Sequence, residues 1–137
     1  MIMNNIIIID DDGKSTESLE LSISLDLVHC KLICFQYPEE FEKANIEDIS
    51  LIILDIMFAG DGVHSGGYNL GIEFYLKYKQ NNPSVPFIIF TNKTANSVGD
   101  NIIKLIKDNG DKFIEKPSVS LDDFITIIKE RLELKCS

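Results

Sequence analysis

Short apolar runs alternate with amphipathic segments along the 137 residues of the chain. The first run, Ile6–Ile9, consists of four β-branched residues, which are stiff and pack well on a pleated surface. Because every position in this run is apolar, we expect a strand buried on both faces, as in a parallel sheet covered by helices. Similar runs predict further strands at 31–35, 51–55, 87–91 and 112–115.

Between these runs, apolar residues recur at helical spacing. In 15–28, Leu19, Ile23 and Leu27 follow one another at intervals of four residues, which is typical of an amphipathic helix. Pro38 opens a short helix that ends near Ala44. Three more helices are predicted at 72–80, at 98–106 up to Asn109-Gly110, and at 121–132 with Ser120 as the cap. Residues 56–71 contain five glycines and predict a long loop.

Five strands alternating with five helices predict an α/β fold. Such a pattern requires a parallel sheet with right-handed crossovers and helices on both faces. The length is that of one domain, so we expect residues 1–137 to form a single unit. A hydrophobic content of 45% and a charged content of 26% are ordinary for a soluble globular domain, and no apolar run is long enough to span a membrane.

Charge and cysteine content limit the cellular compartment and the classes of binding partner that we expect for this chain. A net charge of −9 argues against nucleic acid and anionic membranes, and fits a basic protein partner or bound cations. Cys30, Cys34 and Cys136 form no zinc-binding set, so reduced thiols are expected. The first five residues lack the basic region of a signal peptide. We therefore expect a cytoplasmic protein.

Polar residues end four of the five predicted strands. In a parallel sheet these ends meet at one edge, where α/β folds bind their ligands. The residues are Asp10, Asp11 and Asp12 after the first strand, Asp55 at the third, Thr91 at the fourth and Lys116 after the fifth. Clustered carboxylates repel one another unless a cation lies between them, which predicts bound Mg²⁺. Asp55 is then a candidate nucleophile toward phosphorus, with Lys116 and Thr91 stabilising the transferred group.

With these residues in this order, the chain resembles the response-regulator receiver domain of two-component signalling over nearly its full length. The matching features are the acid pair Asp10 and Asp11, the phosphoacceptor Asp55, the hydroxyl of Thr91, and Lys116 followed by Pro117. The resemblance implies a flavodoxin-like, doubly wound sheet of order 2-1-3-4-5. It also implies a signalling domain rather than an enzyme, with self-catalysed phosphotransfer and dephosphorylation at most.

The resemblance also implies roles for individual residues. Asp11 and Asp55 would bind Mg²⁺ directly, Asp10 would do so largely through water, and the backbone carbonyl of Met57 would supply a further ligand. A sensor histidine kinase or phosphotransfer protein would donate the phosphoryl group to Asp55. Thr91 would then move inward and Phe113 would occupy the vacated space, which would change the surface offered to a downstream protein.

Three positions depart from the usual receiver pattern, and one bond is of special interest. Met57 is followed by Phe58 instead of Pro, and the glycine-rich segment up to Gly71 is several residues too long. Asn92 stands where a small residue is usual, and Phe113 replaces the commoner Tyr. The bond between Lys116 and Pro117 would be cis in the family, which an X-Pro bond permits.

Two other interpretations stay open. Asp10-Asp11-Asp12-Gly13 also matches the opening of haloacid-dehalogenase-like phosphatases, with Asp10 as nucleophile and Asp12 as general acid. That interpretation leaves Asp55 without a role and lacks the final acidic pair, and Asp12 is more simply a helix-capping residue. The chain could also be a degenerate receiver that acts only as an interaction module.

Overall fold

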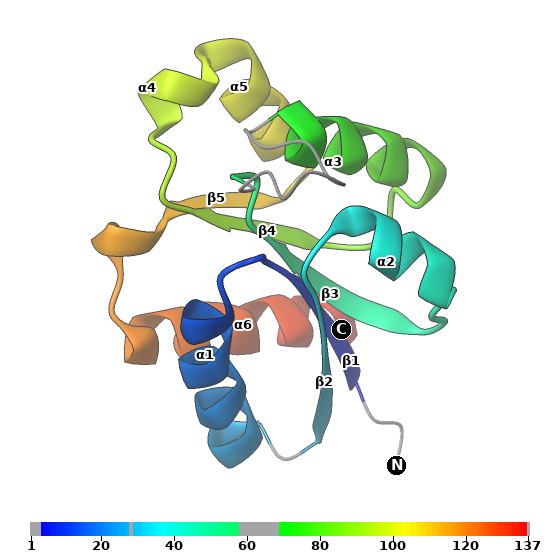
Figure 1. The fold of residues 1–137 in the computed structure, drawn as a ribbon, viewed down its shortest axis with the longest axis vertical. Coiled ribbons are helices and arrows are strands. Elements are labelled where there is room, and N and C mark those ends of the chain that lie inside the picture. The colour runs from blue at the N-terminus through cyan, green and yellow to red at the C-terminus, as the bar shows by residue number, and fades with distance from the viewer. Residues whose placement is uncertain (1–3, 28, 58–68, 137) are drawn as a thin grey trace.

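The computed structural model describes residues 4–27, 29–57 and 69–136, which form a five-stranded sheet with helices on both faces (Figure 1). All strand pairs are parallel, and the order is β2-β1-β3-β4-β5. The strands are β1 (Asn4–Ile9), β2 (Cys30–Phe35), β3 (Ile49–Leu54), β4 (Phe87–Thr91) and β5 (Lys112–Glu115). The predicted doubly wound, flavodoxin-like fold is therefore confirmed.

The helices form two layers. On one face lie α1 (Gly13–Asp26) and α6 (Leu121–Cys136), and on the other lie α2 (Pro38–Ala44), α3 (Asn69–Asn81), α4 (Ala95–Val98) and α5 (Asp100–Asp108) (Figure 1). Ser120 caps α6 as predicted, because its hydroxyl accepts a hydrogen bond from the Asp123 amide at 3.1 Å. Among the described residues, no helix has the length and apolar character needed to cross a membrane.

The opening isoleucine run contributes to both layers of the core. Ile6 and Ile8 pack with Leu19 and Ile23 of α1 and with the apolar face of α6. Ile7 and Ile9 pack on the opposite face, among apolar residues of α2, α3, α4 and α5. All four isoleucines are at most 1% exposed. Because alternate residues of a strand face opposite sides, a run apolar at every position is what a sheet between two helical layers requires.

Two differences between the predicted and observed helices occur at glycine-containing segments. The single helix expected at 98–106 is two helices, because Gly99 adopts a φ of 104° between α4 and α5. That backbone conformation is accessible to glycine and strained for other residues, so the helical ladder breaks there. The described part of the chain therefore contains six α-helices instead of five. In addition, α3 begins at Asn69, three residues before the predicted start. Most of the loop predicted at 56–71, including residues 58–68, lies outside the described residues.

Candidate functional site

The candidate site lies at the carboxyl edge of the sheet. Asp10 directly follows β1 and Asp55 directly follows the adjacent strand β3. The Asp10 amide donates to the carbonyl of Phe35 at 3.0 Å, and the Asp55 amide donates to the carbonyl of Ile9 at 2.9 Å. Backbone pairing thus continues one residue beyond both strands, which holds the two aspartates at fixed positions on neighbouring strands.

Lys116 joins these two aspartates. Its Nζ donates to Asp10 Oδ2 at 2.8 Å and to Asp55 Oδ2 at 2.9 Å. The three side chains are only 11%, 7% and 6% exposed, respectively. The structure therefore brings together three of the predicted site residues, which lie up to 106 positions apart in the sequence.

Burial and charge perturb this cluster. Burial raises the pKa of Asp10 above its ordinary value of 3.8, and the Asp55 charge adds to this, although the hydrogen bonds from Lys116 and the Asp12 amide act in the opposite direction. Burial alone would lower the pKa of Lys116, but its hydrogen bonds to Asp10 and Asp55 and their charges outweigh burial, so the pKa is raised. The cluster therefore contains a firmly protonated lysine beside a carboxylate whose ionisation is opposed by burial.

Backbone amides orient the second oxygen of each aspartate. The Asp12 amide donates to Asp10 Oδ1 at 2.9 Å, and the Met57 amide donates to Asp55 Oδ1 at 2.9 Å. Each aspartate thus closes a short turn with the residue two positions later.

Asp11 lies half-buried between Asp10 and Asp12, at the start of the loop into α1. As predicted for a cap, Asp12 directly precedes α1, and its carbonyl accepts from the Thr16 amide at 3.2 Å.

Gly71 allows α3 to pack closely against Ile56, the residue after Asp55. A Cβ added at Gly71 would lie 2.6 Å from Ile56 Cα and 3.0 Å from its carbonyl oxygen. Real Cβ atoms do not come this close to backbone, so any other residue would displace Ile56 or α3. Sequence reasoning missed this residue, because a glycine near a helix start carries no signal of what packs against it.

Thr91 and Phe113 have the positions predicted for them. Thr91 ends β4 and is fully buried, and its Oγ1 accepts from the Lys93 amide at 3.2 Å. Thr91 belongs to the site through its place at the same sheet edge, and its hydroxyl bonds to the Lys93 amide instead of to Asp55. Phe113 on β5 is half-buried and packs against the core on the side of α5. The side chain of Asn92 is exposed.

Two further features of Lys116 were not expected. Its Nζ lies 5.7 Å from the centre of the Phe90 ring, and that ring stacks on Phe124 of α6 with centres 4.0 Å apart. The cation therefore has an aromatic as well as an acidic neighbour.

The bond to Pro117 is trans, so the cis bond implied by the resemblance is wrong. Trans is the favoured isomer of X-Pro bonds, and Lys116–Ser118 form a 3₁₀ turn there.

The carboxylate oxygens at this edge are the type of ligand that a hard cation prefers. Asp10, Asp11 and Asp55 supply only oxygen, which Mg²⁺ prefers. In their present arrangement, the described residues contain no group of three His, Cys, Asp or Glu side chains that could hold a metal. One reason is that Lys116 takes up one oxygen of Asp10 and one of Asp55. A cation would therefore share these carboxylates with the lysine.

Comparison with solved structures identifies the fold of this chain, whereas comparison with family models and curated proteins finds no match. No protein-family model and no curated protein matches the chain. A CheY-like response regulator receiver domain protein from Methanospirillum hungatei matches with a TM-score of 0.75 and 21% identity, over 97% of this chain and 96% of that one. A receiver domain protein from Clostridium thermocellum matches with a TM-score of 0.71 and 18% identity, over 97% of each chain.

A third solved structure is similar over a comparable length. It is the non-phosphorylated HemR receiver domain from Leptospira biflexa, with a TM-score of 0.69 and 20% identity over 94% of each chain. At these identities the likeness concerns the arrangement of the backbone. The chain therefore has the fold of response-regulator receiver domains.

Proposed function

We propose that residues 1–137 form one receiver domain that accepts a phosphoryl group on Asp55 and signals through changed protein contacts. The observation that carries this proposal is the cluster of Asp10, Asp55 and Lys116 at the carboxyl edge of a receiver-type sheet. Two buried carboxylates and a shared lysine provide a nucleophile, a partial metal-ligand set and a fixed cation within one site. The free thiol of Cys34 suits the cytoplasm, where we place this step.

The transfer itself requires little from the protein beyond position and charge. A carboxylate oxygen of Asp55 attacks phosphorus, an oxygen–phosphorus bond forms, and the phosphorus–nitrogen bond of a donor phosphohistidine breaks. The imidazole leaves with the electron pair of that bond. Lys116 holds an Asp55 oxygen now and would bind an oxygen of the transferred group afterwards. The Met57 amide orients the other Asp55 oxygen.

The chemistry of the acidic residues supports Mg²⁺ as the cofactor. Asp10, Asp11 and Asp55 would hold the ion, with the Met57 carbonyl as a further ligand, and its charge would offset that of the transferred group. Because Lys116 bonds to Asp10 and Asp55 at once, loading the site would redistribute its hydrogen bonds. We further propose that Thr91 and Phe113 respond to phosphorylation. A sensor histidine kinase or phosphotransfer protein would be the donor.

The direct test is to incubate the protein with Mg²⁺ and acetyl phosphate, and to map the acyl phosphate by mass spectrometry after borohydride trapping. We expect one added phosphoryl group in the intact protein before reduction and, once borohydride has reduced the acyl phosphate and released the phosphate, homoserine in place of Asp55. The Asp55→Asn variant should show neither. Omitting Mg²⁺ should abolish the label. The matched control is Asp100→Asn, which removes an exposed carboxylate from the first turn of α5 and should leave labelling unchanged.

The other outcomes are equally informative. A label on Asp10 with steady turnover of a phosphate ester would contradict this proposal and support the phosphatase interpretation. No label on either aspartate, with Mg²⁺ present and the protein folded, would overturn phosphoacceptor function and leave an interaction module. Labelling of Asp55→Asn to the wild-type extent would assign the nucleophile to another residue.

A further inference from the structure

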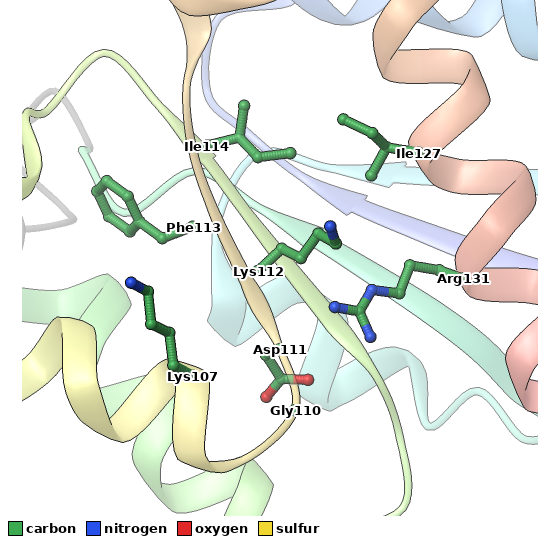
Figure 2. Close-up of a pocket in the computed structure, with 8 residues that line it drawn as sticks. All are labelled: Lys107, Gly110, Asp111, Lys112, Phe113, Ile114, Ile127 and Arg131. Carbon is green, nitrogen blue, oxygen red and sulfur yellow. The ribbon is translucent and has the colours of Figure 1, made fainter.

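A second polar site lies at the outer edge of the sheet, away from the aspartate cluster. A cavity of about 420 Å³ lies around the first half of β5, between α5 and α6 (Figure 2). Its volume is within the range of small-molecule pockets. β5 is the edge strand and pairs only with β4 in the described sheet, so this side is not covered by a neighbouring strand. Lys112 begins this strand, whereas Lys116 of the aspartate cluster follows its far end.

Positive charge is concentrated in this cavity. Lys107, Lys112 and Arg131 line it, although the chain has only 13 Lys and Arg residues and a net charge of −9. Figure 2 shows Lys112 and Arg131 extending into the space between β5 and α6, below Ile114 and Ile127 in this view. Lys107 lies on the other side of the strand, beside Phe113. No ion pair within the described residues involves any of the three cations.

The carboxylate in the cavity wall does not neutralise these cations. Asp111 is 5% exposed, and its oxygens accept hydrogen bonds from the Tyr75 hydroxyl, Lys79 Nζ and the Phe87 amide. Its charge is thus balanced by Lys79, with which it forms an ion pair at 3.1 Å. Among the described lining residues, the positive charge of Lys107, Lys112 and Arg131 therefore has no counter-charge in the cavity.

An unsatisfied donor provides the second observation. Nε of Arg131 is buried and has no hydrogen-bond partner among the residues that the structure describes. Buried N–H groups are nearly always paired in folded proteins, and each exception requires a partner that is absent or an explanation. A guanidinium presents its N–H groups in one plane, in a geometry that matches two oxygens of a phosphate or carboxylate. The oxyanion of a ligand would satisfy this donor and separate the like charges of Lys112 and Arg131.

From these observations we propose that the cavity between α5, β5 and α6 binds a small phosphate-bearing molecule. Arg131 and Lys112 would contact the phosphate, and Lys107 would add charge from the opposite side of β5. Three positive charges in one cavity favour a multiply charged phosphate over a single carboxylate. Neither proposal requires the other, although Phe113 lines this cavity and is also proposed to respond to phosphorylation at Asp55.

Pyrophosphate is a suitable probe, with binding followed by the amide resonances of ¹⁵N-labelled protein without Mg²⁺. We expect saturable shifts at 110–114 and around Arg131, and weaker binding as salt rises. Lys112→Gln and Arg131→Gln should each weaken binding roughly tenfold. The matched control is Lys129→Gln, which removes an exposed charge from the same helix outside the cavity and should change binding less than about twofold.

Four results would overturn the proposal. The first is the absence of saturable shifts at about 10 mM pyrophosphate, a concentration well above useful affinities. The second is an equal loss of affinity in Lys129→Gln and Lys112→Gln. The third is a set of shifts confined to Asp10, Asp55 and Lys116, which would move the anion to the aspartate cluster. The fourth is equal binding of citrate, which would assign the cavity to carboxylates. Lys112 is exposed, so its variant keeps the test valid if Arg131→Gln does not fold.

Discussion

Nζ of Lys116 lies 2.9 Å from Oδ2 of Asp55, and the same nitrogen lies 2.8 Å from Oδ2 of Asp10. The lysine is thus the common partner of two carboxylates that would otherwise face each other across adjacent strands. Its raised pKa means that folding favours the protonated ammonium. The stabilisation from this group is fully present below its ordinary pKa of 10.5 and is lost as the pH rises through the raised value.

Lys116→Met should destabilise the protein. The substitution keeps much of the side-chain volume but leaves Asp10 and Asp55 buried without a cation. We expect the free energy of unfolding at pH 7 to fall by about 2 kcal/mol, below the roughly 3–5 kcal/mol typical of broken buried ion pairs because the lysine is slightly exposed. Urea unfolding measures this loss. Lys104→Met is the control, since Lys104 is 80% exposed and its pair with Asp108 contributes little.

Asp10→Asn should stabilise the protein in the absence of Mg²⁺. Because burial raises the pKa of Asp10, folding opposes its ionisation, and wild-type stability falls as the pH rises from 3.8 through that raised value. Asn keeps an acceptor for the Asp12 amide without the charge. We expect a gain of about 1 kcal/mol at pH 7. The gain should vanish below pH 3.8, where Asp10 is protonated in both states. Thermal unfolding across this pH range measures both features, and a variant less stable than wild type at pH 7 would contradict the argument.

Gly71→Ala should disturb the loop that follows Asp55. The new methyl group would lie 2.6 Å from Ile56 Cα, so α3 or the segment Ile56–Met57 must move. We expect a loss of about 1–3 kcal/mol in stability, which is the usual range for overpacking, together with slower labelling of Asp55 by acetyl phosphate. Gly13→Ala is the control, because nothing lies within 4 Å of a Cβ there. Equal effects of the two substitutions would show that the close approach is unimportant.

The parts of this fold that could be predicted from sequence are those governed by local pattern. Ile6–Ile9 predicted a strand covered on both sides, and its side chains do divide between the two core layers. Polar residues at strand ends predicted a site because parallel strands end at one edge. Asp10, Asp55 and Lys116 do meet there.

What could not be predicted depends on long-range packing or on single backbone angles. The break at Gly99 requires a positive φ, which the apolar periodicity around it does not reveal. The approach of Gly71 to Ile56 depends on how closely α3 packs on β3. Tyr75 lies in the helix predicted at 72–80, but the apolar pattern does not reveal that its hydroxyl bonds to Asp111, 36 residues away. Hydrophobic pattern identifies which residues are buried, but it does not identify their polar partners.

Cys34 should react slowly with alkylating agents. Although Cys34 is exposed as a residue, desolvation around its thiol, its hydrogen bond to Glu20 at 2.8 Å and the negative charge of Glu20 raise its pKa to about 12. In a Cys30→Ser, Cys136→Ser background, the rate with iodoacetamide should still be rising with pH above 9, because only the thiolate reacts. Glu20→Gln should accelerate the reaction at pH 8 roughly tenfold. Glu17→Gln removes an exposed acid from the same helix and should leave the rate unchanged.

The hydrogen bond between Tyr75 and Asp111 should contribute measurably to stability. The Tyr75 hydroxyl lies 2.6 Å from Asp111 Oδ2, and the same carboxylate binds Lys79 and the Phe87 amide, so α3 is tied to β4 and to the start of β5. Tyr75→Phe should reduce the free energy of unfolding by about 1–2 kcal/mol. Asp111→Asn should reduce it by about 3 kcal/mol, because it leaves the buried Lys79 without its counter-charge.

Urea unfolding of both single variants and the double variant measures the coupling between these two residues. We expect the double variant to lose less stability than the sum of the single variants, by about 1 kcal/mol, because Tyr75 and Asp111 share one hydrogen bond. Tyr78→Phe is the control on the same helix. Its hydroxyl makes no hydrogen bond with the described residues, and removing it should change stability by less than about 0.5 kcal/mol. Strict additivity of Tyr75→Phe and Asp111→Asn would mean that their contact contributes nothing of its own, and that the buried Lys79–Asp111 pair alone connects α3 to the start of β5.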